Sequence, residues 1–573
     1  MSQRLSAPAP VVRLVPELVE YAAERYGERP FLLRHAGGTW SGYTFMAAAR
    51  AVRAFTALLE REGVRPGARV ALQSDNRPEW GLAYLSVLAA GAVVVPLDAQ
   101  LKDLEVGEIL AFAEATHAVC DARHLPVLEA ARLARRRLLG LVALDPVPHL
   151  PHWDQALREY VTTAAPAPAA QPHDLAVLLF TSGTTAQAKG VMLSHTNLLS
   201  NVESVVRTFE FSSTDRFLSI LPLHHTFEST AGLLCPLRVG ASVCYARGLA
   251  SRELREDMAS SGATLFIGVP LLYEKLMTAI RNAIDEAPLP TRLLARSLLG
   301  LSRLVRRATG LRLGRTLVRP LRRKAGLDRL RMFVTGAAPF APDVFWRYID
   351  FGWPMVEGYG LTETSPVVCA NRPHHPTPGA VGWPMPGIEV KIEAPDPDGD
   401  GEIAVRGPNV MLGYWRQPEL TAEVLRDGWF HTGDLGRVQT DGRVRITGRL
   451  KNMIATAAGK KIYPEEIEVQ LSNSPYVLEV VVAGGRDPRG EREEVHAHIV
   501  PNLVRLAELA RSQGRACDDA FVERVLKSEV EARCEVLASY KRVKRVIVRT
   551  DEFPKTTTGK IQRGPVPVGT RVG

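Results

Sequence analysis

The residues with the clearest chemical potential are those of TSGTTAQAKG, residues 181–190. An apolar run of strand length, residues 174–180, precedes them, so a buried strand is expected to deliver this turn to a sheet end. Gly183 and Gly190 allow backbone N–H groups to converge on an anion, and Lys189 adds a positive charge. The hydroxyl donors of the turn are Thr181, Ser182, Thr184 and Thr185. The pattern predicts a cradle for a polyphosphate.

The spacing of this turn excludes a Walker A loop. Such a loop requires glycine where Ala188 stands and serine or threonine where Gly190 stands. A P-loop kinase or GTPase is therefore disfavoured. A turn of this composition is, by itself, more often a plain surface loop, so the interpretation depends on downstream residues.

Polar and small residues also follow several other apolar runs. HHTFEST (residues 224–230) follows RFLSILPL, RMFVTGAAPF spans residues 331–340, and MVEGYGLTETSP spans residues 355–366. Strand ends are where α/β proteins place their ligands. His224 and His225 have no third metal ligand at a suitable spacing, so structural or pocket-lining histidines are expected there rather than a metal site.

The elements that position these residues alternate between strands and helices. Residues 68–122 read as a β-α-β-α-β series, which predicts a largely parallel sheet covered by helices. Residues 27–45 suggest a short hairpin around Gly37 and Gly38. The apolar segment 81–98 is divided by Gly91 and Pro96, so it is interpreted as core and not as a membrane span. No G-x-G-x-x-G motif follows these strands, which argues against a dinucleotide site.

The length of 573 residues predicts two or more domains. A net charge of +9 fits anionic substrates, a phospholipid surface or nucleic acid, and does not choose between them. The six cysteines form no C-x-x-C pair, so neither a zinc knuckle nor a disulfide scaffold is suggested. With no recognisable secretion signal, we expect a cytoplasmic protein, with a peripheral place at the inner face of the membrane as an alternative.

Residues 288–330 form a basic and leucine-rich segment. They contain twelve Arg or Lys residues, interleaved with leucines at helical spacing. The simplest interpretation is a solvated face on helices that pack by their leucines. Peripheral contact with an anionic membrane is the main alternative, and nucleic acid is not expected as a partner.

Seven motifs in this order resemble the acyl-adenylate-forming superfamily, which contains acyl-CoA synthetases, luciferases and adenylation domains of peptide synthetases. The resemblance covers roughly residues 20–563. Within the superfamily, the chain is most similar to long-chain fatty acyl-CoA synthetases. Besides the cradle and the segments 331–340 and 355–366, the motifs are GDGEIAVRGPNVMLGYW (399–415), DGWFHTGD (427–434), GRLKNMI (448–454) and PKTTTGKIQR (554–563). The resemblance implies an α/β fold with a large N-terminal domain of βα-layered sheets, a β-barrel-like lobe and a small mobile α+β C-terminal domain.

The resemblance implies an ATP site with Mg²⁺. Glu363 would hold the metal together with Thr184, and a hard cation that bridges phosphate oxygens favours such ligands. Tyr359 would stack on adenine, Asp434 would accept the ribose hydroxyls, and Arg449 would reach ribose or the α-phosphate. The remaining expected ATP-site residues are Gly336, Ala337, Ala338, Glu357, Gly358, Gly360 and Thr362.

The resemblance also implies a catalytic lysine, Lys560, in a C-terminal domain of residues 450–573, after an N-terminal ATP- and acyl-binding domain of residues 1–449. Lys560 would offset charge between the attacking carboxylate and the α-phosphate. The C-terminal domain is expected to rotate about Lys451 and to bring Gly459 and Lys460 to the cleft for coenzyme A (CoA).

The expected acyl pocket lies beside the strand-end motifs, and His225 is included among the catalytic residues. Its lining would be His225, Thr226, Ile267, Gly268 and Val269. We expect it to be apolar and roomy, which favours a medium- to long-chain fatty acid with CoA as the acceptor. The alternatives are a fatty acyl-AMP ligase that loads a carrier protein, and a ligase for aryl or short-chain acids. A non-enzymatic nucleotide- or membrane-binding protein would have no use for Lys560.

Overall fold

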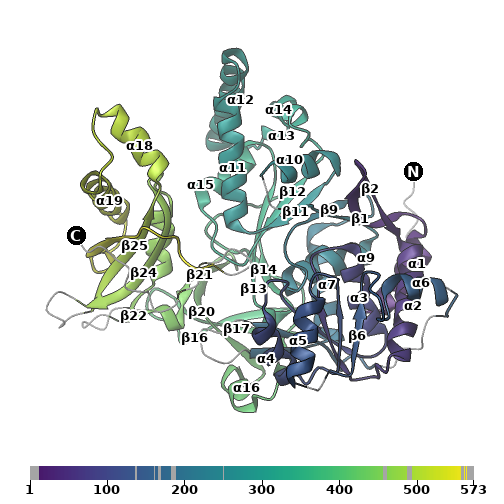
Figure 1. The fold of residues 1–573 in the computed structure, drawn as a ribbon. Coiled ribbons are helices and arrows are strands. Elements are labelled where there is room, and N and C mark those ends of the chain that lie inside the picture. Colours follow the sequence, from purple (N-terminus) through teal and green to yellow (C-terminus); the bar gives the residue numbers. More distant parts are fainter. Residues whose placement is uncertain are drawn as a thin grey trace.

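The structure is a computed structural model that describes residues 12–135, 138–160, 162–164, 170–181, 189–248, 251–455, 461–486, 493–555, 561 and 563. A large body is built from two long sheets with their helices, and a smaller C-terminal unit lies to one side of it (Figure 1).

The first long sheet has nine strands. They span Pro30–Ala36 (β1), Thr39–Thr44 (β2), Arg216–Ser219 (β9), Ser242–Tyr245 (β10), Leu265–Gly268 (β11), Met332–Thr335 (β12), Met355–Gly360 (β13), Val367–Ala370 (β14) and Trp383–Pro384 (β15). Their order is β15–β14–β13–β12–β11–β9–β10–β1–β2. The run from β13 to β1 is parallel, whereas β1 and β2 form the predicted hairpin. The parallel run brings the C-terminal ends of several strands to one sheet edge.

The second long sheet has seven strands. They span Arg69–Gln73 (β3), Val93–Pro96 (β4), His117–Cys120 (β5), Gly140–Ala143 (β6), Leu175–Thr181 (β7), Lys189–Ser194 (β8) and Gly413–Tyr414 (β18). Their order is β18–β8–β7–β4–β3–β5–β6, and the pairs from β7 to β6 are parallel. The predicted β-α-β-α-β series is therefore confirmed.

One large core joins the two sheets. It combines strand residues of both with helices Glu17–Tyr26 (α1), Phe45–Arg61 (α2), Pro78–Ala89 (α3), His195–Phe209 (α7) and Cys235–Val239 (α9). Every residue of α3 is buried, which confirms that the apolar segment 81–98 belongs to the core. Helix α7 begins at a capping box, where the Ser194 hydroxyl accepts from the Asn197 N–H at 3.2 Å. Shorter helices cover the outside: Asp103–Ala113 (α4), Leu125–Arg135 (α5) and Trp153–Glu159 (α6).

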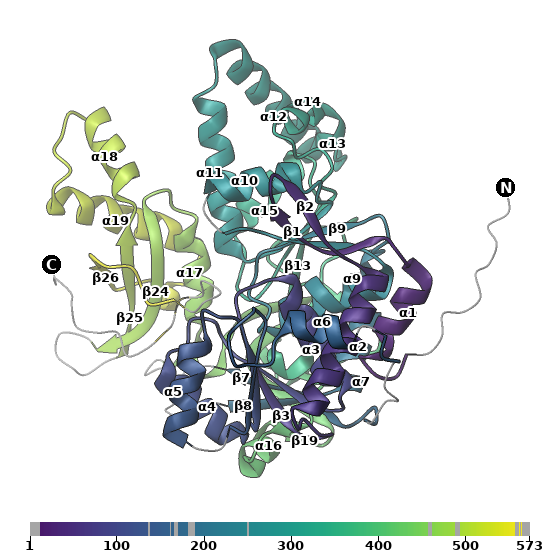
Figure 2. The same ribbon diagram turned by 45° about the vertical axis from the view of Figure 1, so that its right-hand side comes forward.

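Helices after β10 form a second core and a projecting arm. They span Ser251–Ser260 (α10), Pro270–Asp285 (α11), Leu289–Thr309 (α12), Gly314–Leu317 (α13), Arg319–Lys324 (α14) and Pro342–Asp350 (α15). The short helix Thr226–Glu228 (α8) comes before β10 and packs in the first core. Helices α11 and α12 rise from the body in both ribbon views (Figures 1 and 2). Only Ala295 and Ser302 of α12 are fully buried; Leu299 packs against the second core, whereas most other leucines of α12 are exposed, so the expected packing by leucines holds only in part. A π-helical turn, Ser229–Leu234, follows α8 inside the body.

An antiparallel lobe and the C-terminal unit complete the chain. The lobe holds Glu389–Glu393 (β16), Gly401–Arg406 (β17), Leu425–Arg426 (β19), Trp429–Val438 (β20) and Val444–Arg449 (β21), with helix Pro418–Val424 (α16) beside it. The C-terminal unit holds strands Ile454–Ala455 (β22), Lys461–Ile462 (β23), Val477–Arg486 (β24), Glu493–Pro501 (β25) and Arg545–Val548 (β26). Its helices are Pro464–Ser472 (α17), Leu503–Ser512 (α18) and Asp519–Cys534 (α19), and it has a core of its own.

The predicted fold class is confirmed: layered α/β sheets, an antiparallel lobe and a small α+β C-terminal unit. Among the described residues, no helix combines the length and the apolar character needed to cross a membrane.

Candidate active site

Two antiparallel strands hold the ends of the predicted phosphate cradle side by side. Strand β7 ends at Thr181 and β8 begins at Lys189, and these two residues face each other across the ladder. The two flanks of the cradle are thus fixed at the end of a buried strand pair, as the apolar run predicts. The other predicted cradle residues, Ser182, Gly183, Thr184 and Thr185, lie outside the described residues.

A tyrosine connects the cradle to the predicted metal ligand. Strand β18 pairs with β8 and places the Tyr414 ring under Lys189, whose Nζ lies 5.2 Å from the ring centroid. The Tyr414 hydroxyl donates to Oε1 of Glu363 at 2.8 Å. Glu363 itself stands in a short 3₁₀ turn, Thr362–Thr364, directly after β13. Lys189 and Glu363, 174 positions apart in the sequence, are brought together by this single side chain.

Sequence reasoning did not single out Tyr414. The residue is the second-last of the motif 399–415, and the available signal was its position directly after Gly413 in that motif. Nothing in the sequence pattern indicates that this strand adds to the edge of β8, because the two segments lie in different parts of the chain.

A second group joins Tyr359, Asp434 and Arg449. Asp434 on β20 faces Arg449 on β21 across the ladder, and Arg449 Nε lies 2.7 Å from Asp434 Oδ1. The hydroxyl of Tyr359 on β13 donates to the other oxygen, Oδ2, at 2.8 Å. Burial, and then Asp434, raise the pKa of Tyr359 well above its usual value, so the hydroxyl keeps its proton. A carboxylate offers about four lone-pair sites, so Asp434 can still accept further hydrogen bonds.

Positive charge gathers beside Asp434. Lys451 follows β21 in a 3₁₀ turn, Leu450–Asn452. Burial lowers the pKa of Lys451, and the neighbouring charges of Arg449 and Lys189 lower it further, whereas Asp434 raises it. Cations from β8 and from the end of β21 therefore act on the same region. Such mutual repulsion is relieved when an anion binds, which suits a polyphosphate.

Small residues line the neighbouring sheet edge. Gly268, Thr335 and Glu357 stand in register on β11, β12 and β13, so Gly336 and Gly358 follow at the same edge. A Cβ added at Gly336 would lie 3.3 Å from the Gly358 carbonyl oxygen and 3.6 Å from the Phe227 ring. The predicted adenine-side segment and the predicted acyl pocket therefore share one edge. Ala337, with φ of 71°, and Ala338 continue this segment.

The residues of the predicted acyl pocket meet at that edge. His225 precedes α8, Thr226 begins it, and Phe227 is the residue that reaches Gly336. Ile267 and Gly268 end β11, and Val269 follows. Burial lowers the pKa of both His224 and His225, whose ring centroids are 4.2 Å apart, so both rings are neutral at neutral pH. His224 Nε2 lies 3.5 Å from Asp98 Oδ2, and this contact is not an ion pair while the histidine is neutral.

The structure shows the protonation state of one predicted ATP-site residue, Glu357, and a steric requirement at another, Gly360. Glu357 is buried, and burial raises the pKa of its carboxyl to about 8, so it is protonated at neutral pH. A Cβ on Gly360 would overlap the carbonyl oxygen of Pro366, so the turn after β13 requires glycine whether or not a ligand binds.

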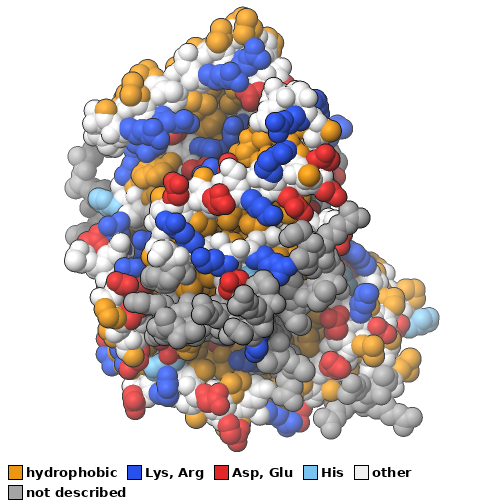
Figure 3. Space-filling view, turned by 90° about the vertical axis from the view of Figure 1, so that its left-hand side faces the viewer, with side chains coloured by type: hydrophobic (Ala, Val, Ile, Leu, Met, Phe, Trp, Pro, Cys, Tyr) orange, Lys and Arg blue, Asp and Glu red, His pale blue; other side chains and the backbone are white. Residues whose placement is uncertain are grey.

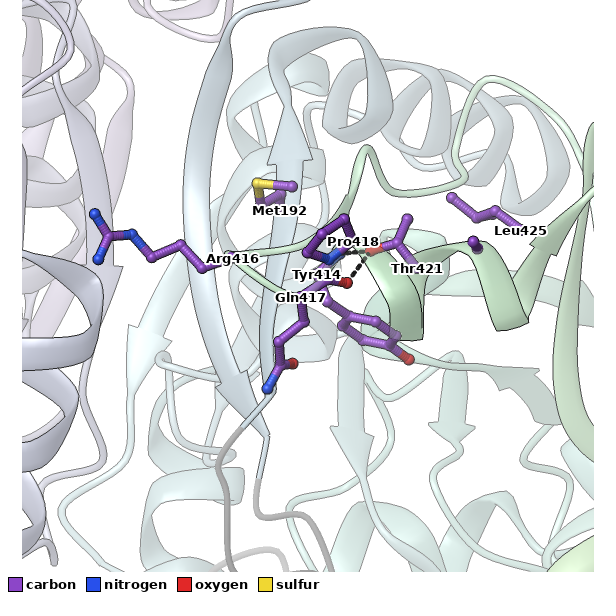
Figure 4. A pocket seen from close by; sticks show the side chains of 8 residues that line it. Met192, Tyr414, Arg416, Gln417, Pro418, Thr421 and Leu425 are labelled. Atoms are coloured by element: carbon purple, nitrogen blue, oxygen red, sulfur yellow. Dashed lines mark hydrogen bonds between the residues drawn. The ribbon is translucent and has the colours of Figure 1, made fainter.

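A surface pocket lies behind Tyr414 rather than among the polar groups. It has a volume of about 460 Å³ and is lined by Met192, Tyr414, Arg416, Gln417, Pro418, Thr421, Ala422 and Leu425 (Figure 4). The Tyr414 N–H donates to Thr421 Oγ1 at 2.9 Å, and this hydroxyl donates to the Gln417 carbonyl at 2.8 Å. These bonds anchor β18 to α16 and so hold Tyr414 in position. The pocket shares only Tyr414 with the site and offers no reactive carboxylate or lysine.

The C-terminal tail is tied to α17. The Arg563 guanidinium forms ion pairs with Glu468 and with Glu465, the latter at 3.4 Å. Glu465 also accepts from the Asn452 side chain at 2.6 Å, so the tail and the turn after β21 share a partner. The predicted catalytic residue Lys560 and the predicted CoA-site residues Gly459 and Lys460 lie outside the described residues.

Comparison with known proteins identifies the family of this chain. The sequence model of the AMP-binding enzyme family matches residues 19–415, and that of the AMP-binding enzyme C-terminal domain matches residues 466–560. The chain belongs to the AMP-binding enzyme family. The predicted family is thereby confirmed.

Relatives of this AMP-binding enzyme act on different acids. It is 32% identical to a feruloyl-CoA synthase of Amycolatopsis sp., over 93% of this chain and 94% of the relative. It is 29% identical to a long-chain-fatty-acid–CoA ligase of Salmonella typhimurium, over 96% of this chain and 93% of the relative. The solved structure of ATP-bound MatB from Rhodopseudomonas palustris matches with a TM-score of 0.73 and 27% identity, covering 96% of this chain and 97% of that one.

The AMP-binding enzyme is thus an acid–thiol ligase of the acyl- or aryl-CoA type, and the predictions of ATP, Mg²⁺ and CoA are confirmed. The described residues fit these groups. Glu363 offers carboxylate oxygen, the ligand that a hard cation prefers, and Lys189, Arg449 and Lys451 offer positive charge for phosphates. Bound there, Mg²⁺ would neutralise charge on the phosphate oxygens.

Proposed function

We propose that this AMP-binding enzyme is an ATP-dependent fatty acyl-CoA synthetase that favours medium- to long-chain fatty acids. The observation that carries the proposal is the convergence of Lys189, Glu363, Asp434 and Arg449 beside the small-residue sheet edge. One side of this region offers charge for a nucleotide, and the other offers apolar and small residues for an acyl group.

The proposed reaction has two steps. In the first, a carboxylate oxygen attacks the α-phosphorus of ATP, the bond to the β-phosphate oxygen breaks, and pyrophosphate leaves with acyl-AMP formed. In the second, the CoA thiolate attacks the acyl carbonyl carbon, and AMP leaves as the thioester forms. Lys560 would stabilise the charge that develops in the first step.

The described residues have matching roles in this proposal. Thr181 and Lys189 would hold the β- and γ-phosphates, and Asp434 would accept the ribose hydroxyls while Arg449 neutralises its charge. Tyr359 would present a ring face to adenine, with its hydroxyl bond to Asp434 setting the orientation of the ring. Gly336 and Gly358 would allow adenine to approach the backbone.

The acyl side supports an apolar substrate. Ile267, Val269 and Phe227 are hydrophobic, and the neutral state of His225 avoids placing a charge beside an acyl chain. The similarity to a long-chain-fatty-acid–CoA ligase over most of both chains points the same way.

A second candidate substrate is an aryl acid of the hydroxycinnamate type. The specific observation in its favour is the 32% identity to a feruloyl-CoA synthase over 93% of this chain. An enzyme for fatty acids and an enzyme for aryl acids would use the same nucleotide site. They would differ in the acyl group that binds at the sheet edge beside His225.

The deciding experiment measures release of pyrophosphate and AMP with saturated acids of rising length, acetate, benzoate and ferulate, each with and without CoA. Turnover that depends on CoA and is fastest with medium- or long-chain acids supports the proposal. Strict preference for ferulate would favour the second candidate, and strict preference for acetate or benzoate would contradict the proposal. Acyl-AMP that accumulates regardless of CoA would indicate a ligase that loads a carrier protein.

The proposed role of Lys560 has its own test. Lys560→Ala should lower the rate of acyl-AMP formation about 10²–10³-fold, the usual cost of removing one transition-state donor. Lys527→Ala, an exposed lysine on α19 of the same C-terminal unit, is the matched control and should leave the rate unchanged. Equal rates in the two variants would remove Lys560 from the proposal.

A further inference from the structure

The helix α12 has three distinct faces. Its inner face carries the two buried residues Ala295 and Ser302, seven positions apart, and the Ser302 hydroxyl donates to the Asp350 carbonyl at 2.8 Å. This face docks the helix on the body. A spacing of seven residues returns to nearly the same side of a helix, so both fully buried residues of α12 lie on one narrow stripe.

A second face of α12 is apolar and exposed. Leu293 and Leu294 are 55% and 54% exposed, and Leu301 and Leu304 are 46% and 65% exposed. At 100° per residue, their positions fall on one side of the helix, well away from Ala295 and Ser302. Leu289 before them and Leu311 and Leu313 after the end of the helix are also exposed, at 56%, 57% and 41%. Scattered surface leucines need no explanation, but a contiguous row indicates an interaction surface.

A third face of α12 is basic. Arg292, Arg296, Arg303 and Arg307 follow one another at intervals of four, seven and four residues, which places them in one row. This row borders the exposed leucines on one flank. No Asp or Glu occurs from residue 287 to residue 327.

Acidic partners from other elements neutralise only part of this charge. Asp350 of α15 pairs with Arg306 at 2.6 Å and with Arg303 at 3.4 Å, and Asp285 of α11 pairs with Arg296 at 2.8 Å. Both side chains of the Arg296–Asp285 pair are at least half exposed, so water screens their attraction. The surface of α12 therefore stays positive.

The helix is placed where a flat surface can reach it. It projects above the body in both ribbon views (Figures 1 and 2). In the space-filling view the uppermost part of the molecule has hydrophobic and basic side chains side by side (Figure 3). A long helix with an apolar row, a basic border and no acidic residue has the amphipathic pattern that is typical of helices lying in a membrane interface.

We propose that α12 docks this protein on an anionic phospholipid surface, with its leucine row in the acyl boundary and its arginine row against the headgroups. Nucleic acid would match the arginines but would leave the leucines in water. The proposal does not depend on which acid the enzyme activates, because it concerns a surface away from the nucleotide site.

The test measures binding of the whole protein to vesicles by sedimentation. Vesicles of phosphatidylcholine alone are compared with vesicles that also contain phosphatidylglycerol, at low and at high salt. We expect binding to the anionic vesicles that weakens with salt, because exposed charges are screened. Equal binding to neutral vesicles, or binding to neither, would overturn the proposal.

Two sets of variants assign the binding to α12. The triple change Leu294→Gln, Leu301→Gln and Leu304→Gln should lower the vesicle partition coefficient about tenfold or more, since it removes the apolar row. Arg292→Gln with Arg307→Gln should reduce the preference for anionic over neutral vesicles. The matched controls are Leu104→Gln on α4, which is 78% exposed, and Arg252→Gln on α10, which is 86% exposed; both should bind as the wild type does.

Further readouts separate the alternatives. Melting temperatures should be unchanged in the triple leucine variant, and Leu304→Gln alone provides a milder variant if they are not. Turnover with a short water-soluble acid should also be unchanged, because α12 holds none of the site residues. Wild-type vesicle binding in the leucine variant would overturn the proposal, and so would loss of a dimer instead of loss of vesicle binding.

Discussion

Tyr414 links two predicted functional residues. Its hydroxyl bonds to Glu363 and its ring lies under Lys189, so it supports both the proposed metal ligand and the proposed phosphate ligand. Tyr414 is therefore a positioning residue: it acts through its neighbours and has no reactive role of its own.

Tyr414→Phe removes one hydroxyl while keeping the ring. We expect the Mg²⁺ concentration for half-maximal activity to rise about tenfold, because a hydrogen bond to a charged group contributes about 1.5–3 kcal/mol. The measurement is a Mg²⁺ titration of pyrophosphate release at saturating ATP. Tyr160→Phe, which removes a hydroxyl that accepts from Arg61 at the surface, is the control. An unchanged Mg²⁺ dependence would show that Glu363 needs no support from Tyr414.

Asp434 is the shared partner of Tyr359 and Arg449. Asp434→Asn removes the charge and keeps the size, so we expect the dissociation constant for ATP to rise about tenfold. Calorimetric titration of ATP measures this directly. Asp441→Asn makes the same charge change at the far turn of the β20–β21 hairpin, where Asp441 pairs with Arg443, and should leave ATP affinity unchanged. Equal affinities in the two variants would speak against a ribose contact at Asp434.

At the scale of elements, α8 and the π-helical turn after it enclose a buried acid. Glu228 accepts from the Ser219 hydroxyl at 2.5 Å, and its carboxyl lies against Gly232 of the turn. Burial raises the pKa of Glu228 to about 8, while the Ser219 bond opposes this shift only in part. At neutral pH the group is protonated, which fits a buried acid that accepts from a neutral hydroxyl.

This raised pKa predicts how stability depends on pH. Between the usual carboxyl pKa and about 8, the folded state holds a proton on Glu228 that the unfolded state has lost. The free energy of unfolding should therefore fall as pH rises through this window, by up to ~1.4 kcal/mol per pH unit, and level off above it. Glu228→Gln cannot ionise, so it should lose this part of the pH dependence and gain relative stability at the alkaline end.

The measurement is denaturant unfolding at about pH 6 and about pH 8. The pKa values of Glu357, Glu274 and Glu468 are also raised, so the wild type has contributions from several acids, and the comparison with the variant isolates Glu228. Glu531→Gln, at an exposed position on α19, controls for loss of a surface carboxyl. A pH profile of Glu228→Gln that parallels the wild type would contradict a protonated Glu228.

At the scale of the whole molecule, the end of β21 separates two independently packed parts. The body has its own cores, the C-terminal unit has another, and Lys451 stands in the short turn between them. This arrangement fits the predicted division into residues 1–449 and 450–573, and the rotation about Lys451 stays a prediction. A few residues at an element's end are sufficient to absorb such a rotation.

Lys451→Pro tests that rotation. Proline fixes φ near −65°, so relative to Lys451→Ala we expect acyl-AMP formation to be unchanged while thioester formation falls about tenfold or more. The two half-reactions are measured separately in single turnovers, the second with preformed acyl-AMP and CoA. Lys451→Ala removes the same charge without restricting the backbone, so it is the reference: any loss due to the charge appears in both variants, and only Lys451→Pro should lose thioester formation selectively. Equal losses in the two half-reactions would argue against a hinge at this position.

The sequence by itself determined the family, the layered α/β fold and most of the candidate residues. Glycine and hydroxyl residues after apolar runs mark strand ends, and local periodicity marks the strands and helices, so these inferences need only neighbouring residues. Residue 360 had to be glycine for a local turn, and Asp434 and Arg449 face each other because a single hairpin joins them.

Only the tertiary structure decided which distant segments contact one another and which helix faces stay exposed. The pairing of β18 with β8, which puts Tyr414 between Lys189 and Glu363, depends on an added edge strand, and edge pairing leaves no periodic signal. The leucines of α12 have the same spacing as core leucines, and sequence spacing does not say whether a helix is covered by others. Their exposure follows from α12 projecting from the body, a property of how the helices pack and not of the helix itself.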